Sequence, residues 1–238
     1  MRLRALVLAL LLAPAASAQT VDEVVAKYTA ARGGAERWKA VQSLEMTGIF
    51  TSYSQSHPFT MRWKRPGLYR FESTSMTHAF KVGRDAGGVW WIFPGYGIQE
   101  AARAQEPDSV VITRDSEFEP LLFGWKEKGH KVELAGPGDI DGQATLQLKV
   151  TLANGWTETW HLDPKTFLEV AVDSRTVDRT QPGGENMPQR AYFLEFRTVE
   201  GLVIPHRIEK EFGARHSVLE IEKVTVNPAL DDAAFKMP

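Results

Sequence analysis

The 238-residue sequence contains no cysteine, and this absence excludes several ways of stabilising or anchoring a protein. Disulfide bonds and thiolate metal sites are excluded, and so is a lipid-modified N-terminal cysteine. Beyond the first 18 residues the chain also lacks any apolar run approaching the ~20 residues of a membrane-spanning helix. The protein must therefore derive its stability from a buried apolar core, for which this length is sufficient.

The chain has neither an excess of positive charge nor the residue spacings of common enzyme sites. Its 28 basic and 30 acidic residues leave a formal net charge of −2, whereas proteins that bind nucleic acid present a basic surface. The six histidines are scattered, and the HExxH, GxSxG and phosphate-loop spacings do not occur. His161 and Asp163 could share one strand face, but we interpret them as a solvated strand end, and Asp139 and Asp141 as turn residues. We expect no enzyme, no catalytic residue, no cofactor and no metal site.

The first 18 residues have the pattern of a secretory signal peptide. Two arginines precede an apolar run over residues 5–13, and an Ala-Ser-Ala sequence ending at Ala18 offers small side chains for cleavage. We expect residues 1–18 to be removed and residues 19–238 to form a single domain; the alternative is a frayed apolar N-terminus. Export without cysteine predicts a soluble protein of a bacterial periplasm, or a secreted one, that carries no lipid anchor.

The clearest strand pattern lies between residues 59 and 72. Large apolar side chains alternate with polar ones over residues 59–64, which is the period-two pattern of a strand with one apolar face. Pro66-Gly67 is a turn signal, and the alternation resumes at residues 69–72. The segment therefore predicts a hairpin with aromatic rings on one face and charges on the other.

Helices are expected in three places. Thr20 and Glu23 have the spacing of a capping box, and apolar residues follow at helical spacing as far as Tyr28. A second short helix is expected at residues 35–41. Residues 107–125 form the one long stretch after residue 43 with helical rather than strand periodicity, so we expect helical segments there.

The rest of the chain has short strands separated by turn signals such as Asn154-Gly155 and Gly136-Pro137-Gly138. Such a series predicts a meandering antiparallel sheet, and about a dozen strands curl or close rather than stay flat. Residues 176–189 have the composition of a long, mobile loop. Further strands are expected at residues 44–53, 79–83, 89–94, 131–135, 144–152, 157–162, 168–175, 192–199, 203–211 and 218–226.

Several stretches resemble the periplasmic lipoprotein carriers of the LolA/LolB type and the outer membrane lipoprotein-sorting homologues. They are the Trp-Lys-Arg-Pro-Gly hairpin at residues 63–71, the Gly/Asp turn and aromatic strand at residues 83–91, the helical segment at residues 31–39 and the tail at residues 227–238. The resemblance covers essentially the whole mature chain. It implies a mainly β fold with helices (α+β), in which a strongly curved antiparallel sheet forms an incomplete barrel. An N-terminal helix and a central helical insertion would form the lid, and the apolar concave face would hold acyl chains.

A set of apolar side chains could line such a cavity, although from composition alone the same residues would form a filled core. Methionine suits an adaptable wall, and about ten buried CH₂ groups at ~0.8 kcal/mol each would supply ~8 kcal/mol before the costs of binding. The candidates are Leu44, Met46, Phe59, Met61, Trp63, Tyr69, Phe71, Phe80, Trp90, Ile92, Leu121, Leu122 and Phe123.

Three cations near the hairpin turn, Lys64, Arg65 and Arg70, could contact a lipid headgroup or an acidic partner, or could simply keep an exposed turn soluble. The sequence predicts a monomeric carrier or chaperone that binds the acyl chains of a lipid or lipid-modified protein without covalent chemistry. An envelope or outer-membrane partner is expected, and nucleic acid is not. The alternative is an envelope scaffold or sensor with a filled core and no ligand. In the carrier, residues 107–125 would cover the cavity mouth and yield to the ligand.

Overall fold

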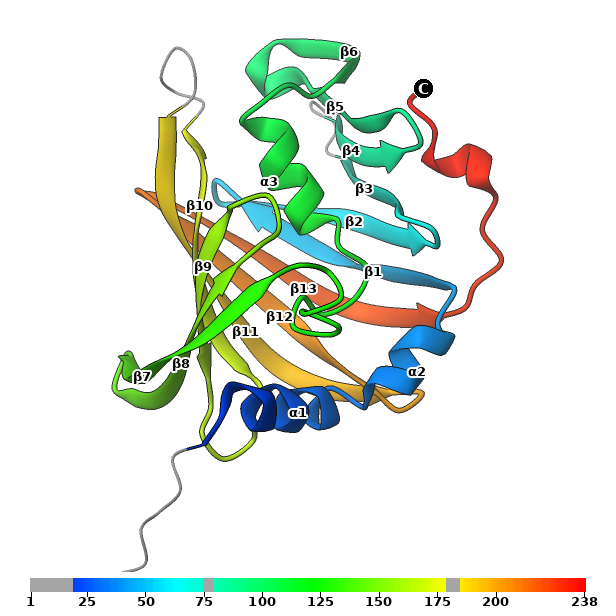
Figure 1. Ribbon diagram of the computed structural model, residues 1–238. Coiled ribbons are helices and arrows are strands. Elements are labelled where there is room, and N and C mark those ends of the chain that lie inside the picture. Colours follow the sequence, from blue (N-terminus) through cyan, green and yellow to red (C-terminus); the bar gives the residue numbers. More distant parts are fainter. Residues whose placement is uncertain (1–18, 75–78, 179–184) are drawn as a thin grey trace, which may run out of the picture.

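The computed structural model describes residues 19–74, 79–178 and 185–238, so the expected signal peptide lies outside the described residues. Thirteen strands form one antiparallel sheet, strongly curved and open, with β6 and β7 at its two edges (Figure 1). Among the described residues, no helix has both the length and the apolarity needed to cross a membrane. The incomplete barrel expected from the sequence is confirmed.

The sheet consists of two meanders that join where β1 pairs with β13. We call β1–β6 the first meander and β7–β13 the second meander. The first comprises β1 (Ser43–Ser52), β2 (Gln55–Lys64), β3 (Leu68–Thr74), β4 (Ala79–Asp85), β5 (Gly88–Phe93) and β6 (Ile98–Arg103). The second comprises β7 (Lys131–Ile140), β8 (Gln143–Thr151), β9 (Thr157–Leu162), β10 (Glu169–Asp178), β11 (Glu185–Val199), β12 (Leu202–Phe212) and β13 (Arg215–Val226).

Helices lie at one end of the sheet and across its concave side. α1 (Val21–Ala31) begins with the expected capping box of Thr20 and Glu23, and α2 (Ala35–Ala40) follows it at the lower end in Figure 1. α3 (Asp108–Asp115) lies over the concave face and contacts both β5 and β10, so it connects the two meanders (Figure 1). Two short 3₁₀ helices are η1 (Pro94–Tyr96) and η2 (Asp232–Phe235).

The C-terminal segment, residues 227–238, packs on the first meander at β3 and β4. Phe235 is fully buried there, and its carbonyl accepts a hydrogen bond from Trp90 Nε1 at 3.1 Å. Arg70 donates to the Ala234 carbonyl at 2.6 Å, and its guanidinium lies 5.4 Å from the centre of the Trp90 ring. Trp90 is thus covered by the chain's own tail on the outer face of the sheet.

Three local expectations need correction. Within the loop expected at residues 176–189, residues 176–178 belong to β10, which continues to Asp178, and residues 185–189 belong to β11, which begins at Glu185, while residues 179–184 lie outside the described residues. The turn expected at residues 136–138 lies within β7, where a register shift after Leu134 accommodates the glycines. Of the helical stretch at residues 107–125, α3 alone is a helix, and turns follow it. In each case the pairing of strands or the packing of the loop overrides the local composition.

Candidate functional site

The concave face of the sheet and α3 line a cavity of about 690 Å³ that is partly open to solvent. Residues of both meanders line it, together with α3 and residues 117–121. Protein interiors are close-packed and contain few voids larger than a water molecule. A space of this size means that the concave face is not a filled core.

The first meander contributes a mainly apolar surface, the apolar wall, formed by the apolar cavity-lining side chains of β1–β5; four polar residues of these strands, Ser52, Gln55, His57 and Ser73, also line the cavity. Strand register places Met46, Met61, Phe71, Val82 and Trp91 in one row across these five strands. The rings pack on one another, with centroids 5.6 Å apart for Phe71 and Phe80. The wall is formed by Leu44, Met46, Phe50, Met61, Trp63, Tyr69, Phe71, Phe80, Val82, Trp91 and Phe93.

The second meander lines the cavity with a mixture of apolar and polar side chains. Lys210 on β12 pairs with Ala191 on β11 and with Ser217 on β13, and Gln189 pairs with Ser174 on β10. We call the cavity-lining polar side chains of β10–β13 the polar wall. They are Glu169, Ser174, Thr176, Gln189, Lys210, Arg215 and Ser217. Apolar residues of the same strands also line the cavity, including Val172, Phe193, Ile204, Ile208 and Leu219.

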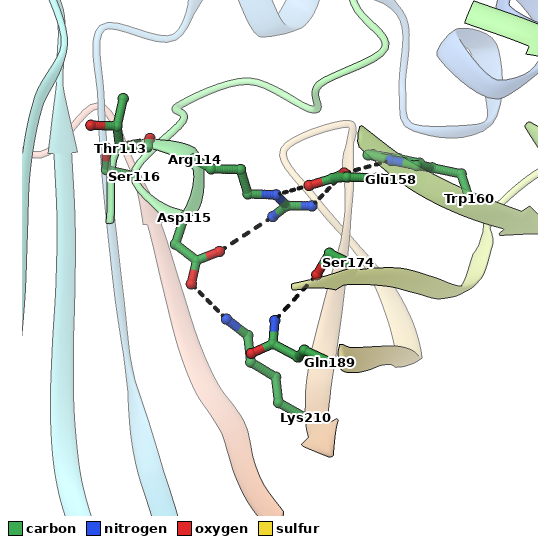
Figure 2. Close-up of polar contacts among 9 residues, drawn as sticks. All are labelled: Thr113, Arg114, Asp115, Ser116, Glu158, Trp160, Ser174, Gln189 and Lys210. Carbon is green, nitrogen blue, oxygen red and sulfur yellow. Dashed lines mark hydrogen bonds and ion pairs between the residues drawn. The ribbon is translucent and has the colours of Figure 1, made fainter. Parts of the chain in front are cut away.

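Two ionic ties hold the end of α3 to the second meander (Figure 2). Arg114 forms two hydrogen bonds with Glu158 on β9, and the fully buried Glu158 side chain also accepts the Trp160 indole N–H at 2.8 Å. Asp115 accepts a hydrogen bond from Lys210 Nζ at 2.7 Å. Burial by itself raises the pKa of Asp115, but the charges of Lys210 and Arg114 outweigh it and lower that pKa below its ordinary value. The carboxylate is therefore ionised at neutral pH and keeps α3 attached to β12.

A sealed polar group forms part of the cavity lining where α1 meets β10. Glu169 accepts hydrogen bonds from Arg32 at 2.7 Å and from the Tyr28 hydroxyl at 2.6 Å. Burial and the charge of Glu169 raise the pKa of Tyr28 well above its usual value, so the phenol stays protonated and donates. Arg32 Nε and Glu169 Oε2 have no partner among the described residues. Both charges are enclosed, with side-chain exposures of 8% and 3%.

Eight of the thirteen apolar candidates line the cavity. They are Leu44, Met46, Met61, Trp63, Tyr69, Phe71, Phe80 and Leu121.

The remaining five candidates lie elsewhere. Phe59 stacks on Phe71 at 5.8 Å within the buried wall, whereas Leu122 and Phe123 are core residues of the loop after α3. Trp90 and Ile92 were assigned to the wrong face of β5. That strand is apolar on both faces, so its pattern did not indicate that Trp91 and Phe93 line the cavity.

The three candidate headgroup cations lie outside the cavity lining and bind parts of this chain. Lys64 donates to the Leu230 carbonyl at 2.7 Å and to Asp232, and Arg70 binds the tail as described above. Arg65 donates to the Val41 carbonyl at 2.8 Å and pairs with Glu119 in the loop after α3. In the structure these three side chains attach the tail and the loop to the first meander, so the prediction that they contact a headgroup or an acidic partner stays a prediction.

The sequence interpretation missed the charged residues that do line the cavity, notably Arg114, Asp115 and Lys210. The sequence does contain a signal for Lys210. Alternate residues of a strand share a face, so Lys210 lies on the same face as Ile204, Ile208 and Phe212, and a single charged residue on an otherwise apolar face is unusual. Arg114 and Asp115 had no comparable signal. Their partners lie 44 and 95 residues away in the chain.

The remaining candidate pair is arranged differently from the sequence interpretation. His161 bonds Asp173 at 3.0 Å rather than Asp163, and Asp173 is also held by Arg190 at 2.6 Å. Asp163 instead accepts two backbone N–H groups in the turn after β9. Across residues 19–74, 79–178 and 185–238, no group of three His, Asp or Glu side chains is placed to hold a metal ion.

No family model and no curated protein matches the sequence, but solved structures share its fold. A DUF1329 family protein from Desulfovibrio piger has a TM-score of 0.57 and 11% identity over 91% of this chain and 97% of its own. An outer membrane lipoprotein-sorting protein domain from Vibrio parahaemolyticus has a TM-score of 0.57 and 13% identity over 90% and 94%. A LolA superfamily protein from Nitrosomonas europaea has a TM-score of 0.56 and 14% identity over 92% and 98%. The chain therefore has a LolA-like fold.

Proposed function

We propose that this LolA-like protein is a non-covalent carrier that shelters the acyl chains of a lipid or of a lipid-modified protein. The observation that carries the proposal is the cavity of about 690 Å³, bounded on one side by the apolar wall. Its volume falls within the roughly 300–1,000 Å³ of small-molecule sites. The alternative function, a scaffold with a filled core, is disfavoured by the same cavity.

The chemistry of the wall supports alkyl chains as the cargo. Thioether and aromatic side chains present a surface without directional demands, and Met46 and Met61 can adapt to chains of different shape. Burying about ten CH₂ groups supplies ~8 kcal/mol before the costs of association, which corresponds to about micromolar affinity. No covalent step is needed for loading or release, and the carrier function requires no enzyme activity.

The cellular setting of the proposal is the periplasm, with a membrane or an envelope protein as donor and acceptor. This setting rests on the sequence of residues 1–18, and we predict that the mature protein begins at Gln19. Intact-mass measurement on protein from the periplasm of the source cell checks it. A mass that includes residues 1–18 would contradict the prediction.

Native mass spectrometry of protein purified from its own cell envelope tests the carrier function directly. We expect lipid to co-purify at one molecule per chain and to be released by mild denaturation. A titration with Nile red, a neutral apolar dye, should show a blue-shifted, saturable signal that dodecanol displaces. Absence of both lipid and saturable dye binding would refute the carrier function and would favour the scaffold.

A further inference from the structure

Four cations line the cavity: Arg32, Arg114, Lys210 and Arg215. Each meets a carboxylate of this chain, at distances from 2.5 to 3.7 Å. A charged ligand group that enters the cavity must therefore displace one of these carboxylates. The cations differ in how firmly the carboxylate is held, and that difference separates the cations that an anion can reach, Lys210 and Arg215, from those that it cannot.

Two of the cations are committed to their partners. Arg114 holds Glu158 through two parallel hydrogen bonds, and Glu158 is fully buried and also accepts the Trp160 indole N–H (Figure 2). Arg32 and Glu169 are sealed from solvent, and separating them would leave an unpaired buried charge. Neither pair can open to a ligand at low cost.

Lys210 is held much less firmly. Among the described residues its ammonium group donates one hydrogen bond, to Asp115, although an ammonium has three donors. The two side chains are 26% and 33% exposed, and Asp115 has a second cation, Arg114, at 3.4 Å. Asp115 can therefore leave Lys210 and still be paired.

Uncharged donors surround Lys210 on the neighbouring strands. Ser217 lies directly opposite it on β13, and Gln189 lies two residues before its β11 partner, within reach on the diagonal. The Gln189 amide is bonded only weakly to Ser174, at 3.4 Å, and is free to reorient (Figure 2). Arg215 is in the next row on the same face of β13. The corner thus offers ammonium, amide, hydroxyl and guanidinium donors together.

The other carboxylates of the cavity lining do not oppose an anion here, because each has its own cation. Glu117 lies 3.5 Å from Arg84, and Glu119 pairs with Arg65. Glu169 pairs with Arg32 as described above. Asp115 is therefore the carboxylate with which an incoming anion competes.

We propose that Lys210, Gln189 and Ser217 bind the anionic headgroup, a carboxylate or a phosphate, of an amphiphile whose alkyl chain lies on the apolar wall. The headgroup replaces Asp115 on Lys210, while Arg114 and Glu158 keep α3 attached to β9. This inference rests on the proposed carrier function and adds the ligand's charge and orientation. It also makes loading loosen one of the two ionic ties of α3.

Competition with Nile red separates this inference from the carrier function. Dodecanoate, dodecyl phosphate and dodecanol share one alkyl chain, and each is titrated below its micelle concentration. We expect the stronger of the two anions to bind the wild-type protein about tenfold more tightly than dodecanol, in line with one charge-assisted contact. The anion that binds more tightly identifies the headgroup class.

Three variants, each checked for folding by circular dichroism, complete the test. Lys210→Met should reduce the ratio of anion to alcohol affinity to about one, and Asp115→Asn should raise it because the competing carboxylate is gone. Lys149→Met removes an exposed lysine of β8 and serves as the matched control. Equal affinities of the anions and dodecanol for the wild type, or an unchanged ratio in Lys210→Met, would overturn the inference alone. Failure of all three compounds to bind would overturn the carrier function with it.

Discussion

The two meanders line the same cavity with different chemistry. The first presents a row of methionine, aromatic and valine side chains across β1–β5. The second places Lys210, Gln189 and Ser217 among aliphatic residues on β11–β13. The first surface supplies affinity without direction, since dispersion and the hydrophobic effect are non-directional. The second supplies direction, because hydrogen bonds require particular positions.

The difference also shows how a cavity can contain charges without losing stability. Burying a charge costs several kcal/mol unless it is paired. On the polar wall and at α3 the charged groups are paired within the chain, from the sealed Arg32–Glu169 contact to the half-buried Lys210–Asp115 contact. Exposure, rather than the number of ion pairs, separates the structural pairs from the exchangeable one.

The largest effect is expected where a polar contact is fully sealed. Arg32→Met leaves Glu169 buried beside Tyr28 without its cation, and should lower the free energy of unfolding by about 3–5 kcal/mol. The matched control is Arg190→Met, which breaks the half-exposed pair with Asp173. That change should cost about 1 kcal/mol or less. Urea unfolding followed by tryptophan fluorescence measures both, and equal losses would contradict the distinction between sealed and exposed pairs.

The next effect concerns binding and compares the two walls directly. Met61→Glu places a carboxylate in the centre of the apolar wall and should weaken dodecanol binding by at least about tenfold, or ~1.4 kcal/mol. Gln189→Glu introduces the same group on the polar wall, where donors surround it, and should change dodecanol affinity by less than about threefold. Circular dichroism establishes that both variants fold. Equal weakening would show that the walls do not differ in this way.

A smaller effect is expected in the segment that connects the two meanders. Residues 107–125 include α3, which is attached to the second meander through two ion pairs and is followed by the loop residue Leu121 in the cavity lining. Hydrogen exchange with and without dodecanoate should show the protection of this segment changing more than that of the strands around Trp63 and Trp160. Uniform protection in both states would identify α3 as a permanent part of the core.

The smallest effect is a pH dependence at Asp115. Its pKa is lowered in the folded protein, so its contribution is complete above the ordinary Asp pKa of about 3.9 and is lost as pH falls through the lower, folded value. Asp115→Asn should therefore lower the unfolding free energy at pH 7, where the contribution is complete, and should flatten the decrease of that free energy below about pH 4. Urea unfolding at several acidic pH values checks this. An unchanged slope would mean that Asp115 is equally ionised in the folded and unfolded states.

Much of the architecture could be predicted because strands repeat every two residues. The alternation at residues 59–64 and the Pro66-Gly67 turn predicted the β2–β3 hairpin, and the capping box predicted the start of α1. The alternation of residues could not show which face of β5 lines the cavity, because Trp90 and Trp91 are equally apolar. What decides between them is the tail at Phe235, which is 145 residues away from Trp90 in the sequence.

The charged part of the candidate site was beyond local patterns for a related reason. Arg32 and Glu169 are 137 residues apart, and no sequence pattern around either residue indicates that the two form a pair. A charge in a strand is normally assigned to the solvent side. The curvature of the sheet and the position of α3 turn Arg114 and Lys210 toward an interior that exists only in the folded chain. The apolar wall, by contrast, comes from consecutive hairpins and is therefore visible in the sequence.

The pairing of β1 with β13 has a consequence for how the protein is made. Each meander consists of consecutive antiparallel strands, so it can form from contacts that are local in the sequence. The two meanders, however, are joined by strands that lie far apart in the chain, at residues 43–52 and 215–226. Contacts this distant in the chain form slowly. Until they form, the aromatic and methionine side chains of the first meander are not covered by the second meander. Such exposed apolar surface makes a folding intermediate prone to aggregation. A nascent chain of this protein therefore needs a chaperone, or prompt completion of synthesis, most acutely before β13 has emerged.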